Sequence, residues 1–119
     1  MAEKDISYEL IEVDLQNKTE ELFRLNPYGK VPVLVDGDYV IYESAIINEY
    51  LEEKFPKVAL MPKDLHQKAQ TRIWIDFCNT RLQQAAGNYR HGIEPEKAIK
   101  KVNEYLDTLN KTMADKDYI

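Results

Sequence analysis

The sequence has few of the residues on which several classes of protein depend. Cys78 is its one cysteine, which excludes a disulfide within the chain and favours a reducing, cytoplasmic location. The two histidines, His66 and His91, stand far apart with no cysteine at ligand spacing, so no metal site is predicted. No apolar run approaches the roughly 18 residues of a membrane span, and the opening MAEKDISYEL does not have the apolar core of a signal peptide.

A concentration of positive charge is also missing. The 16 Lys and Arg residues are interspersed among 21 Asp and Glu residues, and the net charge at pH 7 is −5. A direct nucleic-acid partner is therefore not expected, because such binders present a basic face. The 119 residues, of which 44% are hydrophobic and 31% charged, are typical of a globular chain that can bury a real core.

The first half of the chain predicts a mixture of strands and short helices. Residues 6–15 alternate apolar and polar side chains, which favours a strand. Asn17 and Glu20 have capping-box spacing and predict a helix through KTEELFRL, which ends at Asn26 because Pro27 follows.

A hairpin and a second helix come next. The runs VPVLV and YVIY flank Asp36-Gly37-Asp38, a strong signal for a β-hairpin. A helix is then predicted from Ser44 to the residue before Pro56. The prolines and lack of periodicity that follow, PKVALMPKD, predict a linker.

The rest of the chain predicts helices only. Asp64 and Gln67 have capping spacing at the start of a long helix from Leu65 to about Tyr89, and Pro95 suits the first position of another helix. The last helix carries an apolar stripe for a partner helix, formed by Ile99, Val102, Leu106, Leu109 and Met113. Because three short strands make a thin sheet and this stripe has few helices to cover it, we expect both ends to be cut from a longer protein.

Two dipeptides could carry binding chemistry. Proline within a strand belongs at a sheet edge, so Val31-Pro32 is either an ordinary edge or a place where the free backbone of Val31 pairs with an extended ligand. Ser44 is either a simple helix N-cap or, with the helix N-terminus, a seat for a ligand carboxylate. Glu43 could then accept a hydrogen bond from a ligand ammonium group.

The remaining candidates are weaker. Lys18, Arg24 and Lys30 are either solvated cations or ligand contacts, and Cys78 is expected to be an inert thiol within an apolar helix. Because the sequence supplies no nucleophile–base pair, carboxylate dyad or phosphate-binding loop, no catalytic residue is predicted, and whether the chain is an enzyme stays open.

The run NPYGKVPVLVDGDYVIYES, followed by LMPKD, resembles the glutathione S-transferase family. The resemblance covers nearly the whole chain and is strongest over residues 26–62. It implies an α/β thioredoxin-like fold, incomplete because the first strand and most of the first helix are lacking, and then an all-α helical segment. The implied organisation is a partial glutathione-binding domain, a linker and a partial helical domain, at residues 1–56, 57–64 and 65–119.

The resemblance also implies roles for individual residues. Pro32 would be a cis-proline, and Val31 would offer its backbone to the cysteinyl part of glutathione. Glu43 and Ser44 would hold the γ-glutamyl group, and Lys18 would lie near the glycyl carboxylate. The family's catalytic Tyr, Ser or Cys belongs to the segment that is lacking, so conjugation of glutathione to an electrophile is expected only of a complete form.

Within the family, YESAIINEYLEEKFP and LMP resemble bacterial proteins related to stringent starvation protein A, which act on RNA polymerase. That gives an alternative, non-enzymatic function, although Pro56-Lys57-Val58 departs from the Pro-His-Pro usual there. A thiol-transfer or isomerase activity would depend on the absent residue. The family also implies a cytoplasmic homodimer.

Overall fold

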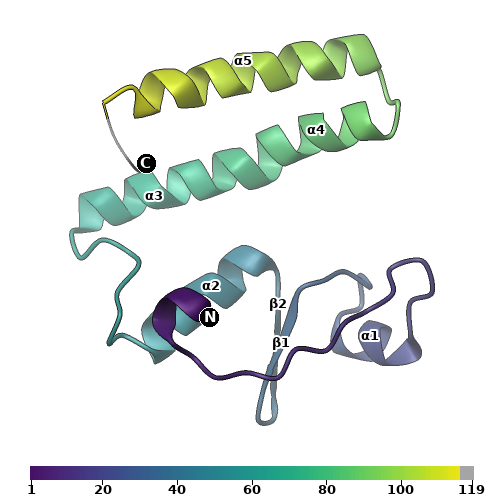
Figure 1. The fold of residues 1–119 in the computed structure, drawn as a ribbon, viewed down its shortest axis with the longest axis vertical. Helices are drawn as coiled ribbons and strands as arrows, with labels where there is room; N and C mark the ends of the chain where they lie inside the picture. The colour runs from purple at the N-terminus through teal and green to yellow at the C-terminus, as the bar shows by residue number, and fades with distance from the viewer. Residues whose placement is uncertain (116–119) are drawn as a thin grey trace. The chain divides into compact units, whose positions relative to one another are not determined.

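The structure is a computed structural model that describes residues 1–115, and the chain divides into two compact units, Met1–Met61 and Pro62–Ile119. The first unit contains, in order, η1 (Ala2–Lys4), α1 (Glu20–Leu25), β1 (Val33–Asp36), β2 (Tyr39–Tyr42) and α2 (Ser44–Lys54) (Figure 1). The second contains α3 (Leu65–Asp76), the π-helix η2 (Phe77–Leu82), α4 (Gln83–Arg90) and α5 (Pro95–Met113). The end of the predicted helical segment, at 116–119, lies outside the described residues.

The predicted hairpin is confirmed. Strands β1 and β2 pair antiparallel, with Asp36 opposite Tyr39 at the closed end and Val33 opposite Tyr42 at the open end. Gly37 lies in the turn with a φ of 60°, a left-handed value that glycine adopts without steric cost.

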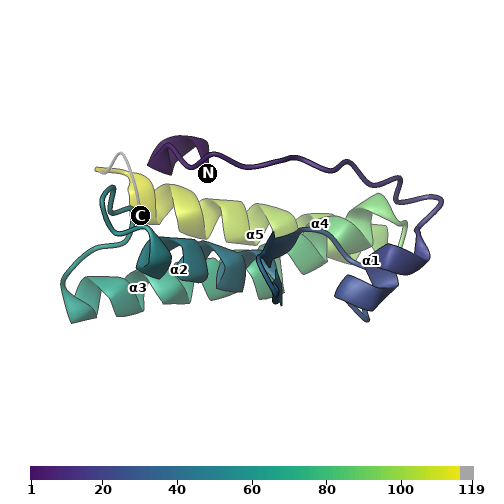
Figure 2. The ribbon, with the colours of Figure 1, turned by 90° about the horizontal axis from the view of Figure 1, so that it is seen from below.

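The predicted strand over residues 6–15 is wrong. The chain leaves η1 as an extended segment that forms no ladder with another described strand (Figure 2). Most of its apolar side chains, including Leu10 and Ile11, are exposed, and Ile6 and Val13 are half-buried. Alternation predicts a face to bury, but a strand also needs a hydrogen-bonding neighbour, and the described sheet has only two strands.

Helix α1 ends where predicted and begins two residues later. Its N-cap is Thr19, whose Oγ1 accepts a hydrogen bond from the Leu22 amide at 3.2 Å. Asn17, the predicted cap, instead donates its side-chain amide to Asp14 at 2.8 Å. A serine or threonine can serve as a cap wherever its oxygen reaches the amide three residues on, and here Thr19 does so.

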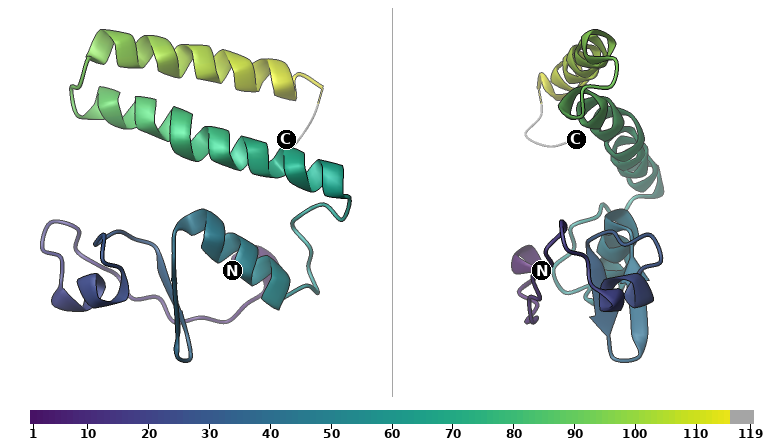
Figure 3. Two further views of the ribbon diagram at one scale, coloured as in Figure 1. Left: turned by 180° about the vertical axis from the view of Figure 1, so that it is seen from behind. Right: turned by 90° about the vertical axis from the view of Figure 1, so that its right-hand side faces the viewer.

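The second unit contains an antiparallel helical hairpin. Asp64 caps α3 through the Gln67 amide, at 2.9 Å, and the helical run continues through η2 and α4 to Arg90, close to the predicted end. It lies beside α5, which begins at Pro95 as predicted (Figures 1 and 3). The sequence did not predict the π-helical turn in its middle.

The apolar stripe predicted for α5 is only partly covered. Ala98 is buried and Val102 and Leu109 are half-buried, while Ile99, Leu106 and Met113 are 36–44% exposed. The covered face includes Tyr105, whose ring lies edge-on to that of Phe77 with centroids 5.4 Å apart. A single neighbouring helix contacts a narrower face than the apolar pattern spans.

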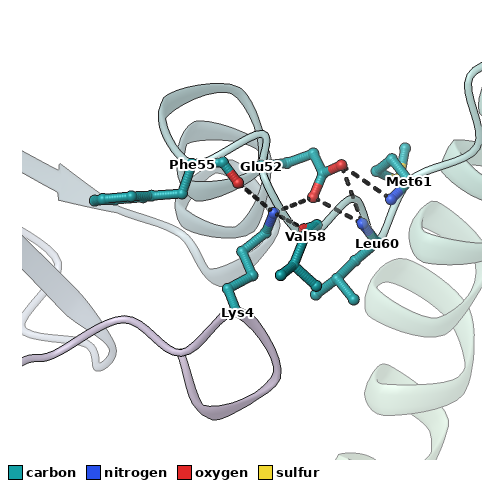
Figure 4. Close-up of polar contacts among 6 residues, drawn as sticks. All are labelled: Lys4, Glu52, Phe55, Val58, Leu60 and Met61. Atoms are coloured by element: carbon teal, nitrogen blue, oxygen red, sulfur yellow. Dashed lines mark hydrogen bonds and ion pairs between the residues drawn. The ribbon is translucent and has the colours of Figure 1, made fainter.

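A buried lysine secures the N-terminus of the first unit. The Lys4 ammonium donates to the carbonyls of Phe55, at 2.9 Å, and Val58, at 2.6 Å, and forms an ion pair with Glu52 (Figure 4). Glu52 in turn accepts hydrogen bonds from the backbone amides of Leu60 and Met61, each at 3.1 Å. These contacts hold η1, the end of α2 and residues 58–61 together. Residues 58–61 form neither helix nor strand.

No helix within residues 1–115 combines the length and the apolar character needed to cross a bilayer.

Candidate functional site

The open end of the hairpin brings the two candidate dipeptides together. Val33 and Tyr42 form the last pair of the ladder, so the next residues outward are Pro32 on one side and Glu43 on the other. Paired residues in an antiparallel ladder lie about 4.5–5.5 Å apart between Cα atoms. The residues that directly follow the last pair therefore start from that spacing. The register therefore places Val31-Pro32 beside Glu43-Ser44.

Val31 is accessible to a ligand. Its residue is 45% exposed, and β1 begins only at Val33, so the ladder leaves its backbone groups unused. The Val31–Pro32 peptide bond is cis, as the family resemblance implied.

A buried asparagine holds the loop that leads to Val31. Asn26 is 1% exposed; its side-chain amide donates to the Lys30 carbonyl at 2.9 Å, and its Oδ1 accepts from the Tyr28 amide at 3.0 Å. The Tyr28 ring meets the Tyr42 ring edge-on, with centroids 6.1 Å apart. The loop is thus fastened both internally and to the end of β2.

The sequence predicted Asn26 as the end of α1 and as the first residue of the run that resembles the family, but not as the residue that holds this loop. The available signal was the Asn-Pro pair, since asparagine before proline favours turns and its side chain bonds the backbone two residues on.

The prediction of Ser44 as the N-cap of α2 is wrong by one residue. Glu43 is the N-cap and Ser44 is the first helical residue. The chain turns into the helix at Glu43 itself, with φ 69° and ψ 114°, a conformation that a residue with a Cβ seldom adopts. Backbone strain of this kind is frequent at functional sites, where the surrounding structure maintains the strained conformation.

The N-terminus of α2 remains open to an anion. No side chain caps it, and the Ile47 amide is the one that bonds the Glu43 carbonyl, at 2.9 Å. The amides of the first turn before Ile47 have no partner in the helix itself. Together with the helix dipole they favour a negatively charged ligand group beside the exposed hydroxyl residue Ser44.

Of the predicted cations, Lys30 directly precedes Val31, whereas the hairpin register does not bring Lys18 or Arg24 to this end. Lys18 is exposed in the segment before Thr19, and Arg24 lies 3.6 Å from Glu21 on its own helix. The role of Lys18 at a glycyl carboxylate stays a prediction. Within residues 1–115, no group of three potential metal ligands occurs.

Comparison with known proteins gives the class of this fold. Residues 1–53 match the family model for the glutathione S-transferase N-terminal domain. The crystal structure of a Tau class glutathione S-transferase from mango, Mangifera indica, superposes with a TM-score of 0.84 at 29% identity, over 94% of this chain and 53% of that one. The fold is that of a glutathione S-transferase: thioredoxin-like, then helical.

Curated relatives agree. A probable glutathione S-transferase of Nicotiana tabacum is 38% identical over 117 residues, which are 97% of this chain and 52% of the relative. A stringent starvation protein A homolog of Pasteurella multocida is 53% identical over 99 residues, 83% of this chain and 47% of the relative. The chain spans about half the length of the curated relatives it matches. It is similar to glutathione S-transferases, whose N-terminal-domain model matches residues 1–53, and to the stringent starvation protein A homologs.

Proposed function

We propose that this protein binds glutathione, and that the open end of the β1–β2 hairpin holds the cysteinyl and γ-glutamyl parts of the ligand. The observation that carries the proposal is the register, which sets Val31-Pro32 beside Glu43-Ser44. The family match over residues 1–53 supports glutathione as the ligand.

The chemistry of each group suits its place. The γ-glutamyl group carries a carboxylate and an ammonium. The carboxylate would accept from the first-turn amides of α2 and from the Ser44 hydroxyl, and the ammonium would donate to the Glu43 carboxylate. The backbone of Val31, preceding Pro32, would pair with the cysteinyl residue as a short added strand.

For a complete form of the protein, the reaction we propose is conjugation of glutathione, through its sulfur, to an electrophile. The thiol would lose its proton to water, and the thiolate would form a bond to the electrophilic carbon as the bond between that carbon and the leaving group breaks. The residues described above would position glutathione for that step; none of them touches the sulfur in the proposed arrangement.

A calorimetric titration with glutathione tests the binding. Ser44→Ala should weaken binding about tenfold or more, because a hydrogen bond to a charged group is lost. Ser7→Ala is a matched control, since Ser7 is an exposed serine in the extended segment. Cysteinylglycine, which lacks the γ-glutamyl group, should bind the wild type and Ser44→Ala equally poorly. Equal affinity of glutathione for all three proteins would overturn the proposed site.

The similarity to stringent starvation protein A homologs, 42% over 108 residues for the one from Haemophilus influenzae, favours a second candidate function. In that alternative the protein is a non-enzymatic regulator that associates with RNA polymerase. Co-sedimentation of the purified chain with RNA polymerase would support it, with a plant glutathione S-transferase as the matched control. Absence of co-sedimentation at micromolar concentrations would count against it.

We also propose that the protein acts as a cytoplasmic homodimer. Analytical ultracentrifugation over a range of concentrations tests the association, and a monomer at every concentration would contradict it. Fractionation of the source cells tests the location.

A further inference from the structure

A cavity lies between the two long helical arms of the second unit. Its volume is about 380 Å³, within the range of small-molecule sites. Residues from η2, α4 and α5 line it: Thr80, Arg81, Gln84, Ala85, Asn88, Lys101 and Tyr105. Ala85 is buried, and most of the other lining side chains end in a hydroxyl, an amide or a positive charge.

The cavity is positively charged in a chain of net charge −5. Arg81 and Lys101 supply two cations, and no acidic residue is among the lining residues. Within the described part of the chain neither cation has a carboxylate partner. An adjoining cavity of about 100 Å³ has Glu94 among its lining residues, and this acid is already paired with Lys97 at 3.1 Å.

A second observation points to the same place. Thr80 and Arg81 belong to the π-helical turn η2, and π-helical turns inside α-helices occur frequently at functional sites. On the opposite arm the Tyr105 ring is fixed by its edge-on contact with Phe77, which also lies in η2. The turn thus supplies a cation and the support for the aromatic wall of one cavity, while the Thr80 hydroxyl donates to the Asp76 carbonyl at 2.8 Å.

We propose that this cavity binds a small organic anion that carries at least two net negative charges on carboxylate or phosphate groups. Arg81 and Lys101 would neutralise two of its charges, and Gln84 and Asn88 would donate further hydrogen bonds. Its lining residues all belong to Pro62–Ile119, whereas the residues of the proposed glutathione half-site belong to Met1–Met61.

Titration at constant ionic strength tests the proposal, with citrate, glycerol 2-phosphate and inorganic phosphate as probes. Saturable binding of citrate or glycerol 2-phosphate is expected, and the double variant Arg81→Gln/Lys101→Gln should lower that affinity at least about tenfold. The control Lys100→Gln/Lys111→Gln removes the same charge from exposed positions of α5 outside the cavity and should change it less than about twofold. Far-UV circular dichroism and a cooperative melt establish that both double variants fold.

The other outcomes overturn the proposal. Absence of saturable binding by all three probes excludes the site, and equal losses in the two double variants reduce it to a non-specific charge effect. Binding of inorganic phosphate alone would exclude an organic ligand. Glutathione, titrated in the same buffers, should bind Arg81→Gln/Lys101→Gln as tightly as it binds the wild type. The proposed glutathione half-site and the proposed anion cavity are therefore tested independently.

Discussion

The ammonium of Lys4 lies 2.7 Å from the carboxylate of Glu52, and the two side chains are only 4% and 17% exposed. The hydrogen bond from Lys4 is the main reason that the pKa of Glu52 is lowered from its ordinary value. The same carboxylate receives the amides of Leu60 and Met61. One charged pair therefore joins the start of the chain to the segment that follows α2 (Figure 4).

Glu52→Gln should lower the free energy of unfolding by about 2–3 kcal/mol, because it leaves the Lys4 ammonium buried without its counter-charge. Urea denaturation measures the loss. Glu53→Gln is the matched control: it makes the same change at the exposed neighbouring residue and should shift stability by less than about 0.5 kcal/mol. Similar losses in both variants would show that the pair does not stabilise the unit.

The contacts at the closed end of the hairpin predict that the folding stability depends on pH in the acidic range. Asp36 accepts hydrogen bonds from Lys54 and from the Tyr50 hydroxyl, and these contacts, Lys54 first, lower the pKa of the Asp36 carboxyl. The stability that the Asp36 carboxylate contributes is fully present above its pKa in the unfolded chain, about 4. This stability is lost as the pH falls through the lower pKa of the folded state.

Urea midpoints from about pH 7 to about pH 3 should show wild type and Asp36→Asn converging as the solution becomes more acidic. Asp38→Asn, at the other acid of the same turn, should run parallel to the wild type throughout. A constant gap between wild type and Asp36→Asn would mean that the carboxylate charge at this position does not matter.

Gly29 should tolerate no side chain. Its φ is +58°, and a Cβ there would stand 2.4 Å from Cε1 of Phe23. Gly29→Ala is expected to cost about 2–4 kcal/mol of unfolding free energy, the sum of left-handed strain and overpacking. Gly37→Ala isolates the left-handed strain, because its φ of +60° is similar and no heavy atom lies within 4 Å of an added Cβ. We expect this variant to lower the free energy of unfolding by about 1 kcal/mol. Equal losses in thermal or urea unfolding would contradict the steric argument.

Glu43 should show opposite effects on stability and binding. Glu43→Gly relieves the backbone strain at a φ of 69°. Once the entropy that glycine adds to the unfolded chain is subtracted, the free energy of unfolding should rise by about 0.5–1 kcal/mol. It should also weaken glutathione binding about tenfold. Glu43→Gln keeps the Cβ and removes the charge, so it should weaken binding without the gain in stability. A loss of stability in Glu43→Gly would show that the backbone there is not strained.

Local patterns predicted much of the fold and of the candidate site. The Asp-Gly turn between two apolar runs gave the hairpin, Asp64 gave the start of the long helix, and Pro95 gave the start of α5. The dipeptides at Val31 and Glu43 were singled out from residue chemistry, and the family resemblance gave them roles. These features depend on contacts between residues close in sequence, which a pattern records directly.

Other features were decided only by tertiary structure. The alternation over residues 6–15 could not reveal whether a strand lies alongside. The capping-box spacing predicted Asn17 as the cap of α1, but it is the Thr19 oxygen that accepts from the Leu22 amide. The sequence determined which residues could bury, cap, turn or carry charge. The tertiary structure decided which of them meet, as Lys4 meets Glu52, because burial and long-range pairing depend on neighbours that lie far away along the chain.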